Sequence, residues 1–156
     1  MALVRILVDG YSLLHYWVEL APGRPRHSAA AREELIHILR HYQDASRTPI
    51  TVVFDGDSKS SKTSDESSAS LEIIYSQRGQ TADQIIERVA YRMRPYGEVM
   101  AVTDDGAERS TVLSLGGMAC GCENFVRLIE NEMRDLDRSI VNYNRGERER
   151  FKRPKS

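Results

Sequence analysis

Short apolar runs alternate with amphipathic stretches along the 156 residues of the chain. The runs are rich in branched side chains, as buried parallel strands are. They lie at 3–8, 50–54, 71–75, 98–102 and 118–120. Apolar residues recur at helical spacing between and after these runs, at 11–20, 28–45, 81–94, 106–115 and 122–138. This alternation predicts an α/β fold with a mostly parallel central sheet.

Local signals support two of the helix starts and one loop. Ser28 is predicted to be an N-cap, and Thr81 with Gln84 has the pattern of a capping box. The segment 56–70 contains seven serines and one apolar side chain, Ala69. Such a segment cannot bury enough surface to offset its ordering entropy, and we expect it to be mobile.

Composition narrows the class of protein. Apolar residues make up 40% of the chain and charged residues 29%, which is typical of a globular domain with a core. Two cysteines cannot form the disulfide framework of a small secreted domain. The first apolar run contains Arg5 and is too short for a signal peptide or a membrane span. We therefore expect a cytoplasmic protein with no membrane association.

Charge divides the chain unevenly, although the formal net charge is only −1. Residues 145–156 contain six basic side chains against two acidic ones. This asymmetry predicts a folded domain at 1–140 and a basic, disordered tail at 141–156. The tail is expected either to be a plain solvated end or to act as an electrostatic tether for a polyanion.

Acidic residues follow three predicted strands directly and also occupy the first turns of a predicted helix. They are Asp9, Asp55, Asp104 and Asp105 after the strands, and Asp83 and Glu87 in the helix. The carboxyl ends of parallel strands meet at one edge of a sheet, where ligands bind. Crowded carboxylates repel each other unless a cation neutralises them, and oxygen ligands suit Mg²⁺ or Mn²⁺. The alternative is that each aspartate only caps a loop or helix.

Other folds with acidic pockets fit the sequence less well. A phosphoaspartate phosphatase needs a second Asp two places after the first, where this chain has Tyr11. A receiver domain needs a lysine after its last strand, and there is none between residues 63 and 151. No glycine-rich phosphate loop follows the first strand.

Five segments carry a family resemblance in a consistent order. They are 6–12 (ILVDGYS), 31–39 (ARxxLxxxL), 52–56 (VVFDG), 74–87 with TADQIIE, and 102–108 (VTDDGAE). Together they resemble the YacP-like NYN domains of the PIN-like nuclease superfamily. The resemblance rests on the order of all five segments along the chain.

The resemblance implies a Rossmann-like, PIN-like three-layer fold with an Mg²⁺- or Mn²⁺-dependent ribonuclease centre. Carried over by position, Asp9, Asp83 and Asp105 would be the catalytic residues and metal ligands. Supporting metal ligands would be Asp104, Glu87 and Asp55. Residues expected to contact substrate are Tyr11, Ser12, Arg78, Thr81 and Arg109. The chain departs from the family pattern at Ser12, where the family has Asn, and at Asp104, where it has Ser.

The leading functional hypothesis is a metal-dependent endoribonuclease, a hydrolase that cuts RNA phosphodiester bonds at the aspartate cluster. The alternative is a non-catalytic RNA-binding adaptor with a degenerate acidic site, and Ser12 and Asp104 motivate it. A DNA or flap-type nuclease ranks lower, because the chain lacks the length for an arch or a DNA clamp. The expected partner is RNA, with presentation by a ribosome or another ribonucleoprotein left open, and a monomer is favoured.

Overall fold

The computed structural model describes residues 3–55, 68, 70–77 and 79–135. The predicted tail at 141–156, most of the serine-rich segment at 56–70, and Arg78 lie outside the described residues. No helix in the described part of the chain is both long enough and apolar enough to cross a membrane.

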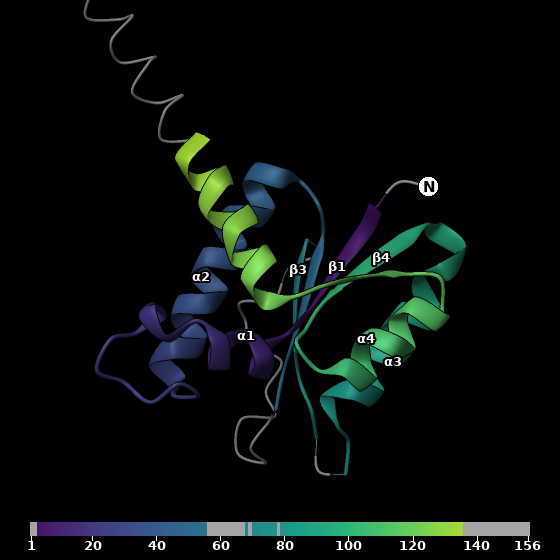
Figure 1. Ribbon diagram of the computed structural model, residues 1–156, viewed down its shortest axis with the longest axis horizontal. Coiled ribbons are helices and arrows are strands. Elements are labelled where there is room, and N and C mark those ends of the chain that lie inside the picture. Colours follow the sequence, from purple (N-terminus) through teal and green to yellow (C-terminus); the bar gives the residue numbers. More distant parts are fainter. Residues whose placement is uncertain (1–2, 56–67, 69, 78, 136–156) are drawn as a thin grey trace, which may run out of the picture.

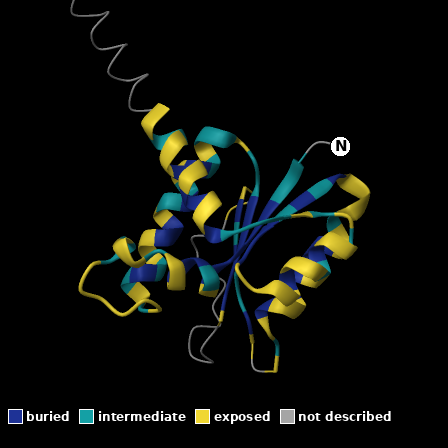
Figure 2. Cartoon of the chain, in the orientation of Figure 1, coloured by how far each residue is buried: buried dark blue, intermediate teal, exposed yellow. Residues whose placement is uncertain are grey.

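Five parallel strands form one sheet in the order β3-β2-β1-β4-β5. Their bounds are β1 Leu3–Asp9, β2 Ile50–Phe54, β3 Leu71–Tyr75, β4 Glu98–Val102 and β5 Met118–Cys120. Each strand coincides with a predicted apolar run. Most residues of the central strands are buried, because helices cover both faces of the sheet (Figure 2).

Helices flank the sheet on both sides, so the predicted three-layer α/β fold is confirmed (Figure 1). Their bounds are α1 Gly10–Tyr16, α2 Ala29–Ser46, α3 Ala82–Met93, α4 Gly106–Ser114 and a final helix at 122–135. Short 3-10 helices follow α1 at Val18–Leu20 and α3 at Arg94–Tyr96. The capping box is present, since Gln84 N–H donates to Thr81 Oγ1 and Thr81 N–H donates to Gln84 Oε1.

Two apolar cores hold the layers together, one on each face of the sheet. On one face, α1, α2 and the helix at 122–135 pack together, and the Tyr42 and Phe125 rings meet edge to face at 5.5 Å. On the other face, α3 and α4 cover the sheet through residues such as Ile86 and Val112. Burial of apolar area on both faces is the main force that fixes the strand ends in space.

The direction of chain progression reverses beside the central strand β1. The chain moves from β1 outward to β2 and β3, and then crosses by α3 to β4 on the other side of β1. Ligands of open α/β sheets bind at such a switch point, outside the carboxyl ends of the strands. The register pairs Val8 with Val102, which sets Asp9 next to Thr103 at this point.

Candidate metal centre

A cleft of about 470 Å³ opens at the carboxyl ends of the strands, where the chain reverses direction. Six acidic side chains line it together with uncharged polar and aromatic groups. The acids are Asp9, Asp55, Asp83, Asp104, Asp105 and Glu108. The predicted convergence of acids at this edge of the sheet is therefore present, with Glu108 added to the set.

Asp9 lies at the base of the cleft with 3% of its surface exposed. Its Oδ1 accepts hydrogen bonds from the backbone N–H groups of Tyr11 (3.1 Å) and Ser12 (3.4 Å), so Asp9 is the N-cap of α1. Its Oδ2 accepts hydrogen bonds from the hydroxyls of Ser12 (3.0 Å) and Thr103 (3.2 Å). Both oxygens of this buried carboxylate are thus satisfied, and its position is fixed by four donors.

Thr103 connects the two central strand ends. Its side chain is fully buried, and its hydroxyl donates to Asp9 while accepting a hydrogen bond from the backbone N–H of Asp105 at 3.0 Å. One hydroxyl therefore sets the distance between the loop after β1 and the loop after β4. A residue without this hydroxyl would leave one oxygen of Asp9 with fewer donors.

Asp105 and Asp83 face the cleft from the starts of two neighbouring helices. Asp105 is the N-cap of α4, and its Oδ1 accepts hydrogen bonds from the N–H groups of Ala107 (2.8 Å) and Glu108 (3.2 Å). Asp83 lies in the first turn of α3, directly after the N-cap Thr81 and Ala82. Both carboxylates therefore lie at the N-terminal ends of their helices.

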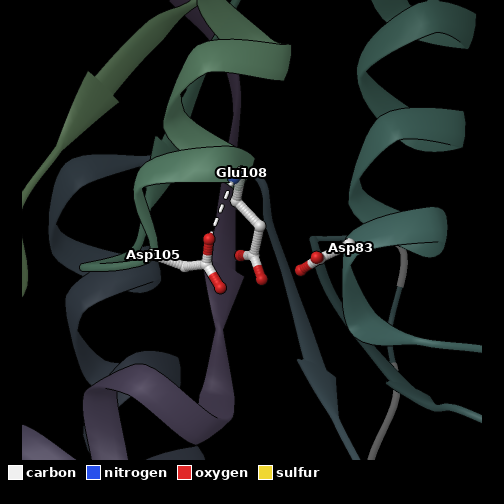
Figure 3. A group of neighbouring side chains, drawn as sticks. All are labelled: Asp83, Asp105 and Glu108. Carbon is white, nitrogen blue, oxygen red and sulfur yellow. Dashed lines mark hydrogen bonds between the residues drawn. The ribbon is translucent and has the colours of Figure 1, made fainter.

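Glu108 points from the first turn of α4 into the space between Asp83 and Asp105 (Figure 3). Only 4% of its surface is exposed, and its Oε1 has no hydrogen-bond partner among the described residues. One oxygen from each of these three side chains lies within 4.8 Å of the others. A buried carboxylate oxygen without a donor is unfavourable, and a cation held among these three oxygens would offset that cost.

The electrostatics of Glu108 agree with this geometry. Burial, and then the adjacent carboxylates of Asp83 and Asp9, raise the pKa of Glu108 to about 10. In the metal-free protein, the side chain therefore keeps a proton near neutral pH. A divalent ion would replace that proton. The carboxylates, which repel one another, would each be attracted to the ion. The residues present fit a divalent metal ion.

The supporting acids occupy different places around the cleft. Asp104 lines it, but its Oδ1 accepts a hydrogen bond from the backbone N–H of Cys122 at 3.0 Å, at the start of the helix at 122–135. Asp55 lines the cleft from the end of β2 and accepts a long hydrogen bond, 3.5 Å, from the Ser76 hydroxyl. Glu87 is exposed on α3 and is not among the described residues that line the cleft.

Of the five residues expected to contact substrate, three line the cleft. Tyr11, Ser12 and Thr81 line the cleft. Arg109 is exposed on α4, outside the described lining of the cleft, and Arg78 lies outside the described residues. The Ser12 hydroxyl orients Asp9, so the departure from the family pattern at this position keeps a donor to the first aspartate.

Sequence reasoning missed two residues of the site, Glu108 and Thr103. The spacing of Asp105 and Glu108 resembles that of a capping box, in which the second acid would reach back to the helix start. Here Asp105 does cap α4, but the Glu108 carboxylate turns into the cleft instead. A glutamate in the first turn of a helix that begins at a strand-end aspartate was the available signal for this role.

Comparisons with known proteins agree with the fold and the motifs. The profile of the YacP-like NYN domain family matches residues 6–155. The Bacillus subtilis (strain 168) protein named "Uncharacterized protein YacP" is 24% identical over 136 residues, which are 86% of this chain and 80% of that protein. The crystal structure of a point mutant of Bacillus subtilis Rae1 (YacP) has a TM-score of 0.76 at 23% identity, covering 90% of this chain and 83% of that one. A second crystal structure of Rae1 (YacP) has a TM-score of 0.74 at 23% identity, covering 94% and 84%.

Proposed function

The chain belongs to the YacP-like NYN domain family, within the PIN-like nuclease superfamily, and on this basis we propose that it is a metal-dependent endoribonuclease. The observation that carries the proposal is the unpartnered, buried Oε1 of Glu108, set among carboxylate oxygens of Asp83 and Asp105 within 4.8 Å. The reaction is the hydrolysis of an RNA phosphodiester bond.

Asp83, Asp105 and Glu108 would hold the ion. All three offer carboxylate oxygens, which fit Mg²⁺ or Mn²⁺ better than Zn²⁺. A divalent ion bound there would supply positive charge for activating a water molecule and for stabilising the leaving oxygen of a phosphodiester. Asp9 lies beside Glu108 with its own oxygens fully hydrogen-bonded, so we assign it to fixing the centre and to adding negative charge.

The charge of the cleft also bears on the substrate. Six acids line it, and a phosphodiester is itself an anion, so the two repel each other without a cation between them. Basic side chains lie close by, since Arg26 Nη1 is 3.3 Å from Nδ1 of His15, which lines the cleft. An anionic strand held by these groups could approach the acids once a metal has reduced their charge.

Ser12 and Asp104, the two residues that motivate the adaptor alternative, both have structural roles. Ser12 donates to Asp9, and Asp104 caps the helix at 122–135, so each departure from the family pattern has a structural role beside an intact acid cluster. A protein that only bound RNA would have no need for the unpartnered oxygen of Glu108. Binding without turnover is therefore the adaptor outcome of the experiment below.

The test is a cleavage time course on end-labelled single-stranded and hairpin RNAs with Mn²⁺, with Mg²⁺ and with EDTA. Asp83→Asn and Glu108→Gln are expected to lower the rate by about a hundredfold or more, because each removes a charged ligand and keeps the side-chain shape. The matched controls are Asp44→Asn and Glu34→Gln, which change exposed acids on α2.

Cleavage that needs the metal and disappears in the two cleft variants would establish the nuclease. Cleavage that persists in EDTA, or in both cleft variants, would overturn the proposal. Circular dichroism and thermal unfolding check that each variant is folded. Whether a ribosome or another particle presents the RNA stays a prediction, and a purified ribosome–messenger complex is the second substrate to try.

A further inference from the structure

A second pocket, of about 300 Å³, adjoins the acid cleft on the side of α1 and β2. It is lined by Tyr11, Leu14, His27, Arg32, Phe54 and Asp55. Tyr11 and Asp55 line both the pocket and the acid cleft, so the two spaces share a wall. Leu14 and Phe54 are buried and give the pocket an apolar floor.

Three aromatic rings with nearly parallel planes gather at this shared wall. Tyr11 stacks on His27 with ring centroids 4.5 Å apart and planes 8° apart. His15 lies 6.3 Å from Tyr11 and 6.5 Å from His27, with planes within 11°. If Tyr11 lay in the middle of a sandwich, the two histidine rings would be much farther apart than 6.5 Å. The far face of Tyr11 is therefore not covered by either ring.

These rings are not explained by the needs of the core. Tyr11 has 51% of its surface exposed, and both histidines are exposed. An aromatic ring held in place by a neighbour and open on one face is a stacking surface at low entropic cost. Positive charge lies beside these rings, because Arg26 Nη1 is 3.3 Å from Nδ1 of His15 and Arg32 lines the pocket.

We propose that this pocket holds one unstacked nucleobase of the RNA strand whose phosphate lies in the acid cleft. The inference rests on the proposed function, because it takes the cleft as the place of the scissile phosphate. The base stacks on the uncovered face of the Tyr11 ring, which His27 supports from the opposite face, and lies over the apolar floor. The arginines meet the backbone on the solvent side.

The size and the polar groups of the pocket fit a single base. A volume of about 300 Å³ is at the small end for ligand pockets, so a base enters and a base pair does not. Arg32 donates one hydrogen bond to the His27 carbonyl at 2.8 Å, and its guanidinium has further N–H groups. Asp55, which also lines the pocket, offers carboxylate oxygens that accept hydrogen bonds. A base edge with adjacent donor and acceptor groups can pair with both residues.

A consequence for the substrate follows from this arrangement. A base can reach the pocket only when it is unpaired and turned out of its stack, which costs least in single strands, loops and bulges. The nucleotide next to the cut is therefore expected to be single-stranded. Preference among the four bases is expected to come from Arg32 and Asp55, because stacking itself is tolerant of base identity.

The test separates base binding from cleavage by using a catalytically silent protein. The Asp105→Asn variant keeps a side chain that can cap α4, and it is mixed with a short single-stranded RNA carrying 2-aminopurine at one position at a time. Stacking in the pocket quenches the fluorescence of this base analogue. The measured quantities are the quench and the dissociation constant.

Two further changes, Tyr11→Ala and His27→Ala, are each made in that background. They leave in place the backbone N–H that Tyr11 donates to Asp9 and the carbonyl of His27 that accepts from Arg32. The matched controls are Tyr96→Ala and His37→Ala, which remove exposed rings outside the described lining of both spaces.

The expected result is a quench at one position only, with binding weakened roughly five- to fiftyfold by Tyr11→Ala and His27→Ala and unchanged by the controls. The same two substitutions in the active protein should raise KM or move the cut while metal dependence is kept. Equal quench and equal affinity in all variants would overturn the base pocket even if the protein cleaves RNA. A position-specific quench lost in Tyr11→Ala, from a protein that cleaves no RNA under any metal, would support the pocket and refute the nuclease.

Discussion

Replacing Glu108 by glutamine is expected to stabilise the metal-free protein near neutral pH. The substitution keeps the shape of a side chain that is 4% exposed and removes its ionisable group. Burial and the carboxylates of Asp83 and Asp9 raise the pKa of Glu108 to about 10, from an ordinary value of 4.5. Between these two values, the folded protein must keep a proton that the unfolded chain releases. Glutamine carries no such cost, and its amide can donate to the neighbouring carboxylates.

The size and sign of the effect follow from proton linkage. The stability that protonated Glu108 contributes is fully present below its ordinary pKa and is lost as the pH rises towards its pKa in the folded protein. Each pH unit in that interval lowers the free energy of unfolding by about 1.4 kcal/mol, which gives roughly 3 kcal/mol at pH 7 as an upper limit. Water in the open cleft screens the acids, so we expect about 1–2 kcal/mol.

Urea unfolding in EDTA measures this difference. The wild type, Glu108→Gln and the exposed control Glu34→Gln are compared at about pH 5 and about pH 7.5, with the free energy of unfolding taken by linear extrapolation. The advantage of Glu108→Gln should be small at the lower pH and clear at the higher one. Glu34→Gln should follow the wild type at both, because Glu34 is exposed on α2.

Addition of Mn²⁺ should reverse the order of stability. Binding to the folded state adds a stability that grows with the logarithm of the metal concentration over the dissociation constant, and Glu108→Gln loses a charged ligand. If Glu108→Gln were less stable than the wild type in EDTA at neutral pH, Glu108 would have to be ionised and satisfied in the metal-free protein. That result would refute the inference that the buried carboxylate of Glu108 is uncompensated in the absence of a metal ion.

Three further outcomes can be checked independently. Gly10→Ala should destabilise the fold by about 1–3 kcal/mol in urea unfolding, because a Cβ at this position would lie 2.5 Å from Phe54 Cδ1; no loss would contradict that close approach. Asp104→Ala should lower stability by about 1 kcal/mol through loss of the hydrogen bond from Cys122 N–H, and Asp104→Asn should retain most of it in thermal unfolding. The ring of His27 should titrate below its ordinary pKa by NMR, since partial burial and then the charge of His15 oppose protonation, and a raised pKa would contradict this.

The fold could be predicted from the sequence because its signals are local and mutually consistent. Each apolar run became a strand, and the pattern of Thr81 and Gln84 gave the capping box that opens α3. Burial on both faces of the sheet explains the continuous apolar runs of strands such as Ile50–Phe54, which is buried throughout. In such a sheet, branched apolar residues both favour the strand conformation and fill the core, so local propensity and overall packing favour the same sequence.

The site was only partly predictable, because side-chain direction depends on the packed structure. The alternation of strands and helices places Asp9 and Asp105 at one edge of the sheet and Asp83 in the first turn of a helix, and the family motifs mark the same three residues. The sequence could not show that Glu108 turns inward, because its spacing from Asp105 also fits a simple helix cap. The Tyr11 and His27 pair was equally inaccessible, since its partners come from different elements whose approach depends on the packing of α1 against α2.

Capping and metal binding compete as explanations of a strand-end aspartate, and the structure shows how one residue can serve both. Asp105 uses Oδ1 to cap α4, and its Oδ2 makes no hydrogen bond within the part of the chain that the structure describes. Asp9 uses both of its oxygens to accept hydrogen bonds, whereas Asp104 uses one oxygen to accept a hydrogen bond at the start of the helix at 122–135. Asparagine keeps a capping oxygen and removes the charge, so Asp→Asn changes distinguish the two roles where Asp→Ala changes cannot. If the cluster binds metal, Asp105→Asn must lose metal affinity at nearly unchanged stability in EDTA.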